Sequence, residues 1–218
     1  MEQLETMGAF FDNRLNGYEE HQLNVIDGAK TFYPFTASLL PTTPKCRILD
    51  LGCGTGLELN EYFPRNPTAS VTGIDLAAGM LERLKEKFSD KALTLIQGSY
   101  FTVPFGTAQF DAAVSVESLH HFSQEQKVPL YRKLHAALKD GGFFILTDYM
   151  AENDGEEQLH FAELARLRAE QHLPQDTFFH YDTPLTRAHE TEALTDAGFS
   201  KVEFLRQWSG TVLLKAYK

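Results

Sequence analysis

The chain has 218 residues, of which 43% are hydrophobic, so its length and composition suit one sizeable domain with a packed core. Its 30 acidic residues against 20 Lys and Arg give a formal net charge of -10, which repels phosphate backbones and opposes a broad nucleic-acid interface. No apolar run approaches the roughly 20 residues of a membrane-spanning helix, and MEQLETMGAF lacks the features of a signal peptide, so we expect a cytoplasmic protein with no membrane segment.

Cysteine and histidine residues do not form a metal-binding pattern in the sequence. Cys46 and Cys53 lack the further ligands and the tight spacing of a disulfide framework or a zinc site, so we expect free thiols. The adjacent His120 and His121 would point in different directions on any regular element, which argues against a joint site. We therefore expect no bound metal.

Apolar runs and helical patterns alternate along most of the chain. Apolar runs predict strands within 46–51, 69–76, 92–98, 110–122, 142–149, 200–208 and 210–218. Helical spacing predicts helices within 17–40, with a break near Pro34, and within 55–63, 78–88, 128–142, 155–172 and 187–199. Pro129 is expected in the first turn of the fourth of these helices.

This alternation indicates an α/β fold with a doubly wound, mostly parallel sheet. The link between the last two strands is so short that they must be antiparallel neighbours. In such a sheet, ligands bind outside the carboxyl ends of the strands, near a topological switch point.

The segment ILDLGCGTG places three alternate glycines directly after the first predicted strand. Gly52, Gly54 and Gly56 do not fit the dinucleotide fingerprint G-x-G-x-x-G, whose third glycine would fall at Leu57. A phosphate is also disfavoured, because Asp50 precedes the turn and further acids follow it. A cationic ligand without phosphate fits this turn better.

The same segment resembles the first motif of the class I S-adenosylmethionine-dependent methyltransferases, (V/I)LD(L/I)GCGTG, and matches it residue for residue. The similarity continues through LKDGGFFILTDY, ETEALTDAGFSKVEFL and TVLLKAYK, so it covers most of residues 46–218. The resemblance implies a seven-stranded sheet of order 3-2-1-4-5-7-6, with the last strand antiparallel and helices on both faces. It also implies S-adenosyl-L-methionine as the cofactor and S-adenosyl-L-homocysteine as the product.

That cofactor carries a sulfonium and an ammonium, and two acids of the chain suit it. Glycines let the backbone approach the methionine part closely, and Asp50 can meet the ammonium directly or through water. Asp75 ends the second predicted strand, where an acid can accept hydrogen bonds from both ribose hydroxyls. Capping of the next helix is an alternative and compatible role for Asp75. The predicted cofactor-binding residues are Asp50, Gly52, Cys53, Gly54, Gly56, Asp75, Leu76, Met80, Gly98, Ser99, Tyr100, Val116 and Glu117.

One position departs from the family pattern. Ser99 stands where many members have an acid that binds the adenine amino group, so we expect adenine recognition by Ser99, Tyr100 and backbone groups. Leu76 and Met80 are expected beside the adenine, although a Met at this spacing also suits core packing. Asp111, which opens the fourth strand, is expected to have a structural role away from the chemistry.

Methyl transfer is an in-line displacement, so positioning and the exclusion of water carry much of the catalysis. A base is needed only where the acceptor begins protonated. Glu117 follows the fourth strand and His121 titrates near neutrality, so these two are the predicted catalytic residues. Cofactor contact is an equal alternative for Glu117, and packing is the alternative for His121. The predicted substrate-binding residues are Tyr18, Asp148, Tyr149 and His180.

Two aromatic-rich segments flank the predicted sheet, a helical N-terminal cap at 1–44 and a helical and loop insertion at 151–184. The insertion is too small to bury its own core, so we expect one domain, 1–218, in which both segments form a lid. The rings expected in this lid are Phe10, Phe11, Tyr18, Phe32, Tyr33, Phe35, Phe178, Phe179, His180 and Tyr181. Core packing is an equal alternative for the N-terminal rings.

The sequence therefore predicts a methyltransferase for a small-molecule acceptor that is flat or apolar, acting as a monomer or a homodimer. Modification of a tRNA wobble uridine is an alternative, which the acidic balance and the lack of a Lys and Arg cluster disfavour. A non-catalytic module that binds S-adenosylmethionine is a second alternative. A nicotinamide oxidoreductase is the most distant one.

Overall fold

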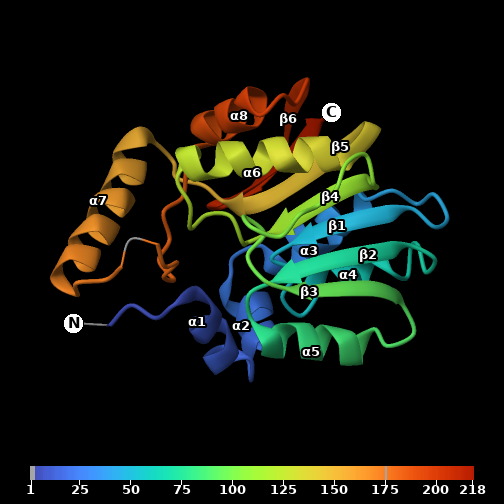
Figure 1. The fold of residues 1–218 in the computed structure, drawn as a ribbon, viewed down its shortest axis with the longest axis horizontal. Helices are drawn as coiled ribbons and strands as arrows, with labels where there is room; N and C mark the ends of the chain where they lie inside the picture. Colours follow the sequence, from blue (N-terminus) through green and yellow to red (C-terminus); the bar gives the residue numbers. More distant parts are fainter. Residues whose placement is uncertain (1–2, 175) are drawn as a thin grey trace.

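Seven strands form one sheet in the order β3-β2-β1-β4-β5-β7-β6 (Figure 1). The computed structural model describes residues 3–174 and 176–218, so parts of the expected cap and insertion lie outside the described residues. The strands are β1 (Arg47–Leu51), β2 (Ser70–Asp75), β3 (Ala92–Gln97), β4 (Phe110–Val116), β5 (Leu138–Tyr149), β6 (Lys201–Trp208) and β7 (Thr211–Tyr217). The first five run parallel, and β7 is antiparallel to β5 and β6, which confirms the predicted fold class and strand order.

Helices cover both faces of this sheet. They are α1 (Met7–Arg14), α2 (Tyr18–Val25), α3 (Ala29–Ser38), α4 (Leu57–Tyr62), α5 (Ala78–Lys87), α6 (Gln124–Ala137), α7 (Asp154–Glu170) and α8 (Arg187–Asp196). In Figure 1, α6 and α8 lie in front of the sheet, whereas α3 and α4 lie behind it. Because the strands are covered on both sides, their apolar runs are nearly continuous rather than alternating with polar residues.

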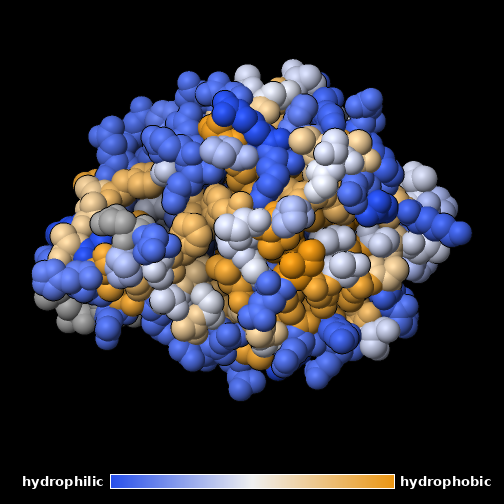
Figure 2. Space-filling view, in the orientation of Figure 1, coloured by the Kyte–Doolittle hydropathy of each residue, from blue (hydrophilic) through white to orange (hydrophobic). Residues whose placement is uncertain are grey.

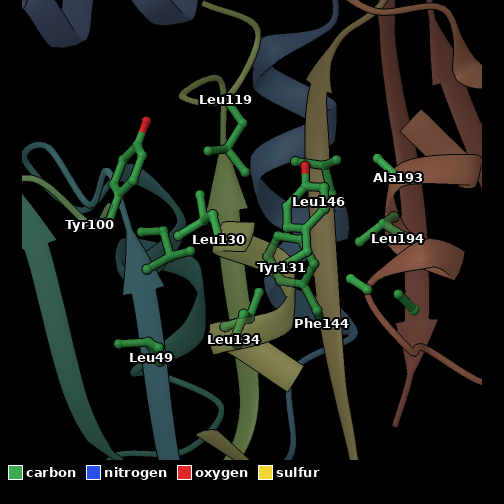
Figure 3. Close-up of a cluster of buried hydrophobic side chains, with 14 of the residues drawn as sticks. Leu49, Tyr100, Leu119, Leu130, Tyr131, Leu134, Phe144, Leu146, Ala193 and Leu194 are labelled. Atoms are coloured by element: carbon green, nitrogen blue, oxygen red, sulfur yellow. The ribbon is translucent and has the colours of Figure 1, made fainter. Parts of the chain in front are cut away.

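The alternation of side chains along each strand divides the core into two clusters. Phe144 and Leu146 of β5 pack with α6 and α8, and Ile145 between them packs on the opposite side, with α3 and α4. Figure 3 shows the first cluster, in which Leu130, Tyr131 and other α6 side chains meet the strands. The two clusters leave the carboxyl ends of the strands free for a site.

Three helix boundaries differ from the sequence prediction. The helix predicted within 128–142 ends earlier, because α6 stops at Ala137 and β5 begins at Leu138 rather than at Gly142. The predicted break near Pro34 is wrong: Pro34 lies inside α3, and the chain turns at Gly28, whose φ is 80°. Pro34 is tolerated because Lys30, whose carbonyl loses its partner, is exposed to water. The start of α6 was also predicted too late. Ser123 and Gln126 form a capping box that begins the helix at Gln124, so Pro129 lies in its second turn.

The helix α7 stands apart from the sheet and buries none of its residues (Figure 1). Figure 2 shows hydrophilic residues around the rim of the same view and hydrophobic ones nearer its middle. None of the described helices combines the length and the apolar character that a bilayer crossing requires.

Candidate active site

The glycine turn after β1 brings bare backbone close to two side chains. Gly52, Gly54 and Gly56 all have positive φ, at 70°, 47° and 71°. A Cβ on Gly52 would lie 1.9 Å from Oγ of Ser118, and one on Gly54 would lie 3.7 Å from the hydroxyl of Tyr18. A Cβ on Gly56 would meet core side chains instead. The first two glycines therefore open a cleft, and the third allows close helix packing.

Asp75 connects this turn to the end of β2. Its Oδ2 accepts a hydrogen bond from the backbone N–H of Gly54 at 2.8 Å, and its Oδ1 accepts one from Ala77 at 2.9 Å. Ala77 is the N-cap residue of α5, so Asp75 has a helix-start role as well. A carboxylate has about four acceptor sites, which leaves Asp75 able to accept from a ribose. Burial raises the pKa of this carboxyl.

A pair of buried acids lies behind the turn. Asp50 and Glu58 are 1% and 4% exposed. Among the described residues, Oδ2 of Asp50 and Oε1 of Glu58 have no hydrogen-bond partner. Burial raises the pKa of both carboxyls, and the charge of Glu58 raises that of Asp50 further. The two carboxyls interact with each other, and two acids buried side by side are costly without a cation, so this place suits a cationic group such as an ammonium.

The cleft beside the turn contains about half of the predicted cofactor residues. It is lined by Met7, Phe11, Tyr18, Gly52, Gly54, Asp75, Leu76, Met80, Tyr100, Glu117, Ser118 and His121. Met7 and Ser118 were not predicted. Met7 lies on a first helix that carried no distinct sequence pattern, whereas Ser118 lies between two predicted residues, Glu117 and the histidines.

The remaining six predicted cofactor residues do not line this cleft. Cys53 points toward β2, since a Cβ on Gly73 would lie 2.7 Å from its Sγ. The hydroxyl of Ser99 accepts a hydrogen bond from the N–H of Phe101 within its own turn. Asp50, Gly56, Gly98 and Val116 also lie outside the lining. Both cysteines are free and buried, as predicted.

A second cavity of about 780 Å³ adjoins the first and shares four of its lining residues, Phe11, Tyr18, Glu117 and His121. Three predicted substrate residues, Tyr18, Tyr149 and His180, line this second cavity, together with His120 and Asp182. Asp148 is instead buried behind His120. Because the two cavities adjoin at these four residues, a ligand in one cavity would lie next to a ligand in the other.

Glu117 lies on this shared wall in a strained conformation. Its φ is 49°, which is uncommon for a residue other than glycine and typical of functional sites. Its Oε1 accepts a hydrogen bond from the hydroxyl of Thr211 at 2.9 Å. Burial raises the pKa of Glu117 to about 7. A carboxyl with this pKa can exchange a proton near neutral pH.

The prediction that His120 and His121 diverge is wrong. They lie in a turn after β4 rather than on a regular element, and their ring centroids are 4.0 Å apart. Nδ1 of His120 is 2.5 Å from Oδ1 of Asp148, and Nδ1 of His121 is 3.1 Å from the carbonyl of Tyr181. Burial would lower the pKa of His120, but Asp148 and Asp182 raise it well above its usual value. Burial and the neighbouring His120 lower the pKa of His121.

Comparisons with known proteins agree with this geometry. Residues 48–142 match a family model described as a methyltransferase domain. The strand order, the glycine turn and the strand-end acid agree with this match. The chain therefore contains a methyltransferase domain that resembles the class I S-adenosylmethionine-dependent methyltransferases. S-adenosylmethionine is the cofactor of that family, and the buried acids and bare glycine turn fit it.

Individual relatives are similar to different parts of the chain. A tRNA (carboxymethyluridine(34)-5-O)-methyltransferase of Arabidopsis thaliana is 30% identical over 56% of this chain and 29% of its own length. A carboxy-S-adenosyl-L-methionine synthase of Trichodesmium erythraeum is 28% identical over 80% of this chain and 74% of its own. A candidate O-methyltransferase structure from Nostoc punctiforme has a TM-score of 0.71 at 23% identity, covering 99% of this chain and 62% of that one. The chain thus spans less than two thirds of several curated relatives, as in the first case.

In this chain the N-terminal helix contacts the insertion across the site. Met7 donates a backbone hydrogen bond to Phe178 at 2.9 Å, and His180 donates one to Glu5 at 2.9 Å. The rings of Phe10 and His180 stack at 3.4 Å between centroids. Of the N-terminal rings, Phe10, Phe11 and Tyr18 line the acceptor-side cavity. Phe32 and Tyr33 are buried in the core, and Phe35 packs edge-on against Trp208.

Proposed function

We propose that the chain transfers a methyl group from S-adenosylmethionine to a small-molecule acceptor held in the cavity of about 780 Å³. The observation that carries this proposal is the wall that this cavity shares with the cofactor cleft at Phe11, Tyr18, Glu117 and His121. The cavity volume falls within the range of roughly 300–1,000 Å³ that is typical of small-molecule sites. The bound cofactor supplies a methyl group on positively charged sulfur.

The cofactor cleft and the acids behind it have a role for each part of such a ligand. Asp75, in the cleft, would accept hydrogen bonds from the ribose, and Asp50, which lies behind the glycine turn and outside the cleft lining, would balance the ammonium by its charge or through water. The apolar side chains of Leu76 and Met80, with the ring of Tyr100, suit an adenine. Gly54 would allow the close approach of the methionine part, and Gly52 leaves room for Ser118, which lines the same cleft.

Glu117 is the residue best placed to accept a proton from the acceptor. It lies on the wall between the two cavities, and its pKa of about 7 allows it to be ionised at neutral pH and still take up a proton. His121 lies on the same wall, and its lowered pKa keeps it neutral and able to accept a proton. In this proposal Glu117 is the base and His121 orients the acceptor.

The segments 1–44 and 151–184 would act as the lid. Their backbone hydrogen bonds and the stacked pair of Phe10 and His180 hold them together above the site. Such a cover excludes water from a displacement in which water competes with the acceptor. The rings on its inner side favour an acceptor with a flat or apolar part.

Two alternatives follow from what the relatives act on. A tRNA acceptor is disfavoured because Arg14 is the one Lys or Arg in the described lining of the acceptor cavity. A carboxylated form of the cofactor would place a negative charge close to Glu117 and to Asp148 behind the cavity wall. A non-catalytic binding module is disfavoured, because it would need neither a base such as Glu117 nor the second cavity.

The test is a methyl-transfer assay with radiolabelled S-adenosylmethionine and bacterial extract separated into small-molecule, tRNA and protein fractions. We expect label in the small-molecule fraction. Gln22→Trp, which places a large ring in the acceptor cavity alone, should reduce transfer and leave S-adenosylhomocysteine affinity unchanged. The matched control is Gln158→Trp on the exposed helix α7. Label confined to tRNA, or no label with the cofactor bound, contradicts the proposal.

A further inference from the structure

Three side chains in the acceptor cavity form a group that methyl transfer does not require. One ring nitrogen each of His120 and His121 and a carboxylate oxygen of Asp182 lie within 4.8 Å of one another. Oδ1 of Asp182 is 3.4 Å from Nε2 of His120 and 3.3 Å from Nδ1 of His121. All three residues line the cavity, so the group is open on one side.

These spacings match those between the ligands of one metal ion. Metal–nitrogen and metal–oxygen bonds of about 2.0–2.1 Å, with tetrahedral to octahedral angles, separate neighbouring ligand atoms by about 3.0–3.4 Å. The two distances from Asp182 lie in this range without any movement of the side chains. A set of two imidazoles and one carboxylate suits Zn²⁺ and similar divalent ions and leaves further positions free.

The surroundings of His120 provide the outer contacts of such a site. Oδ1 of Asp148 lies 2.5 Å from Nδ1 of His120, on the opposite side of the ring from Asp182. Oδ2 of the same carboxylate accepts a hydrogen bond from the N–H of Leu119 at 2.8 Å, which fixes its position. A carboxylate bound to one ring nitrogen holds the other nitrogen ready for a metal. Asp148 is 2% exposed and faces no other cation with its Oδ1.

The local charge also favours a cation. Asp148, Asp182 and Glu117 gather around the two imidazoles. Arg14, the one Lys or Arg in the described lining of the cavity, forms an ion pair with Glu5 at 2.8 Å. Without an ion, Nδ1 of His121 is 3.1 Å from the carbonyl of Tyr181, and Nε2 of His120 is 3.4 Å from Oδ1 of Asp182. An ion would displace the protons on these two nitrogens, whereas the proton on Nδ1 of His120 would stay in the hydrogen bond to Asp148.

We propose that His120, His121 and Asp182 bind a divalent transition-metal ion in the acceptor cavity, with Asp148 as the carboxylate that orients His120. The open side of the site faces the space for the acceptor, so the ion would bind an oxygen of the acceptor, such as a phenol or carboxylate oxygen. This role rests on the proposed function. The metal site itself does not.

The experiment is calorimetric titration of the metal-stripped full chain with Zn²⁺, and with Co²⁺ followed by its visible absorption. We expect one equivalent to bind. Asp182→Asn, nearly isosteric and on a half-exposed side chain, should weaken binding by at least about tenfold, and Asp148→Asn by about 10- to 100-fold. The matched control is His189→Ala, which removes another histidine paired with a carboxylate, Glu157, and should leave the affinity unchanged.

Each outcome is decisive once circular dichroism shows that the variants are folded. No binding to the folded chain, or equal losses in Asp182→Asn and His189→Ala, overturns the site. Loss in Glu117→Gln without loss in Asp182→Asn would place the ion on Glu117, His120 and Asp148 instead and also overturns it. S-adenosylhomocysteine affinity is measured on the same samples. Intact affinity without metal binding rejects only the metal site, whereas metal binding without affinity for S-adenosylhomocysteine rejects only the proposed function.

Discussion

The backbone N–H of Gly54 donates a 2.8 Å hydrogen bond to Oδ2 of Asp75, which ties the glycine turn after β1 to the end of β2. The second carboxylate oxygen is held by the N–H of Ala77. The acid is therefore oriented by its own backbone before a ligand arrives, and its remaining acceptor sites face the cleft. A preorganised acceptor loses little entropy when it binds a ribose.

Replacing Asp75 should reduce cofactor affinity. Asp75→Ala removes the proposed ribose acceptor and loosens the glycine turn, so we expect S-adenosylhomocysteine to bind at least about tenfold more weakly by calorimetry, about 1.4 kcal/mol or more. The matched control is Asp111→Ala at the other end of the sheet, where Asp111 accepts from the N–H of Arg47 and pairs with Lys139. This control should keep its affinity. Unchanged affinity in Asp75→Ala would rule out the ribose role.

Gly52 offers a test of close approach that has an internal control. Gly52 and Gly141 have nearly the same φ, 70° and 75°. A Cβ on Gly52 would lie 1.9 Å from Oγ and 2.5 Å from Cβ of Ser118, whereas one on Gly141 meets nothing within 4 Å. Both Ala variants should lose about 1–2 kcal/mol from backbone strain.

The difference in stability between these two variants measures the effect of the contact between the new Cβ at residue 52 and Ser118. Gly52→Ala should lose more stability than Gly141→Ala in denaturant unfolding, and it alone should lose cofactor affinity. Rotation of the Ser118 hydroxyl cannot relieve the contact, because its Cβ is also too close. Gly52→Ala with Ser118→Gly should recover most of the difference. Equal effects of the two Ala variants would mean that the turn does not need bare backbone at Gly52.

The pKa of Glu117 sets an expected pH dependence. Burial raises it to about 7, so the carboxylate that accepts a proton is present above that pH and is lost below it. Turnover should therefore rise with pH through about 7. Glu117→Gln should lower kcat by about 100-fold or more and remove this step from the pH profile. Glu82→Gln on the exposed face of α5 is the control.

The same shift has a consequence for stability that checks the pKa independently. Glu117 takes up a proton more readily in the folded chain than when unfolded, so its ionisation destabilises the fold as pH rises from about 4.5 toward about 7. Glu117→Gln should remove this loss. Its gain in unfolding free energy over the wild type should therefore be larger at pH 8 than at pH 5. A profile of unfolding free energy parallel to that of the wild type would contradict the raised pKa.

His121 should affect turnover rather than cofactor binding. It lies on the shared wall but has no partner in the glycine turn, and its lowered pKa makes it neutral at pH 7. His121→Ala should reduce kcat and leave S-adenosylhomocysteine affinity nearly intact, measured on one preparation. His172→Ala, at the end of the insertion helix, is the control. A large loss of cofactor affinity in His121→Ala would show that this histidine contributes to cofactor binding and not to turnover alone.

The sequence predicted the sheet because its information is local. Each strand is a short apolar run, and the order of strands was implied by the family resemblance of the ILDLGCGTG segment. The start of α6 was missed although Ser123 and Gln126 carry the capping-box spacing, because Pro129 was taken as the first turn. The sequence therefore did contain the signal for this helix start.

The acceptor side could not be predicted in the same way. Asp182 meets His120 and His121 only because an insertion far along the chain folds back over a turn, and no residue spacing encodes that contact. The rule that adjacent residues diverge holds for helices and strands, and it failed because the two histidines lie in neither. Met7 lies in the cofactor cleft because of another contact between distant parts of the chain, its backbone hydrogen bond to Phe178 of the insertion.

A buried ion pair between α6 and α8 gives a prediction about stability that is independent of the site. Nζ of Lys127 lies 2.5 Å from Oε2 of Glu190, each side chain is 2% exposed or less, and Tyr131 donates to the other carboxylate oxygen. Lys127→Met would leave the Glu190 carboxylate buried with one hydroxyl as its partner. Removing one member of such a pair typically costs about 3–5 kcal/mol.

We therefore expect Lys127→Met to lower the unfolding free energy in urea by about that amount, while Lys127→Met with Glu190→Gln recovers a substantial part, because the uncompensated charge is gone. The control is Lys201→Met, which breaks the exposed pair of Lys201 and Glu203 on β6 and should leave the unfolding free energy nearly unchanged. Since α8 helps to cover the sheet beside β6, the loss should appear as one cooperative transition. A cost in Lys127→Met no larger than in Lys201→Met would show that the buried pair contributes no more to stability than the exposed one.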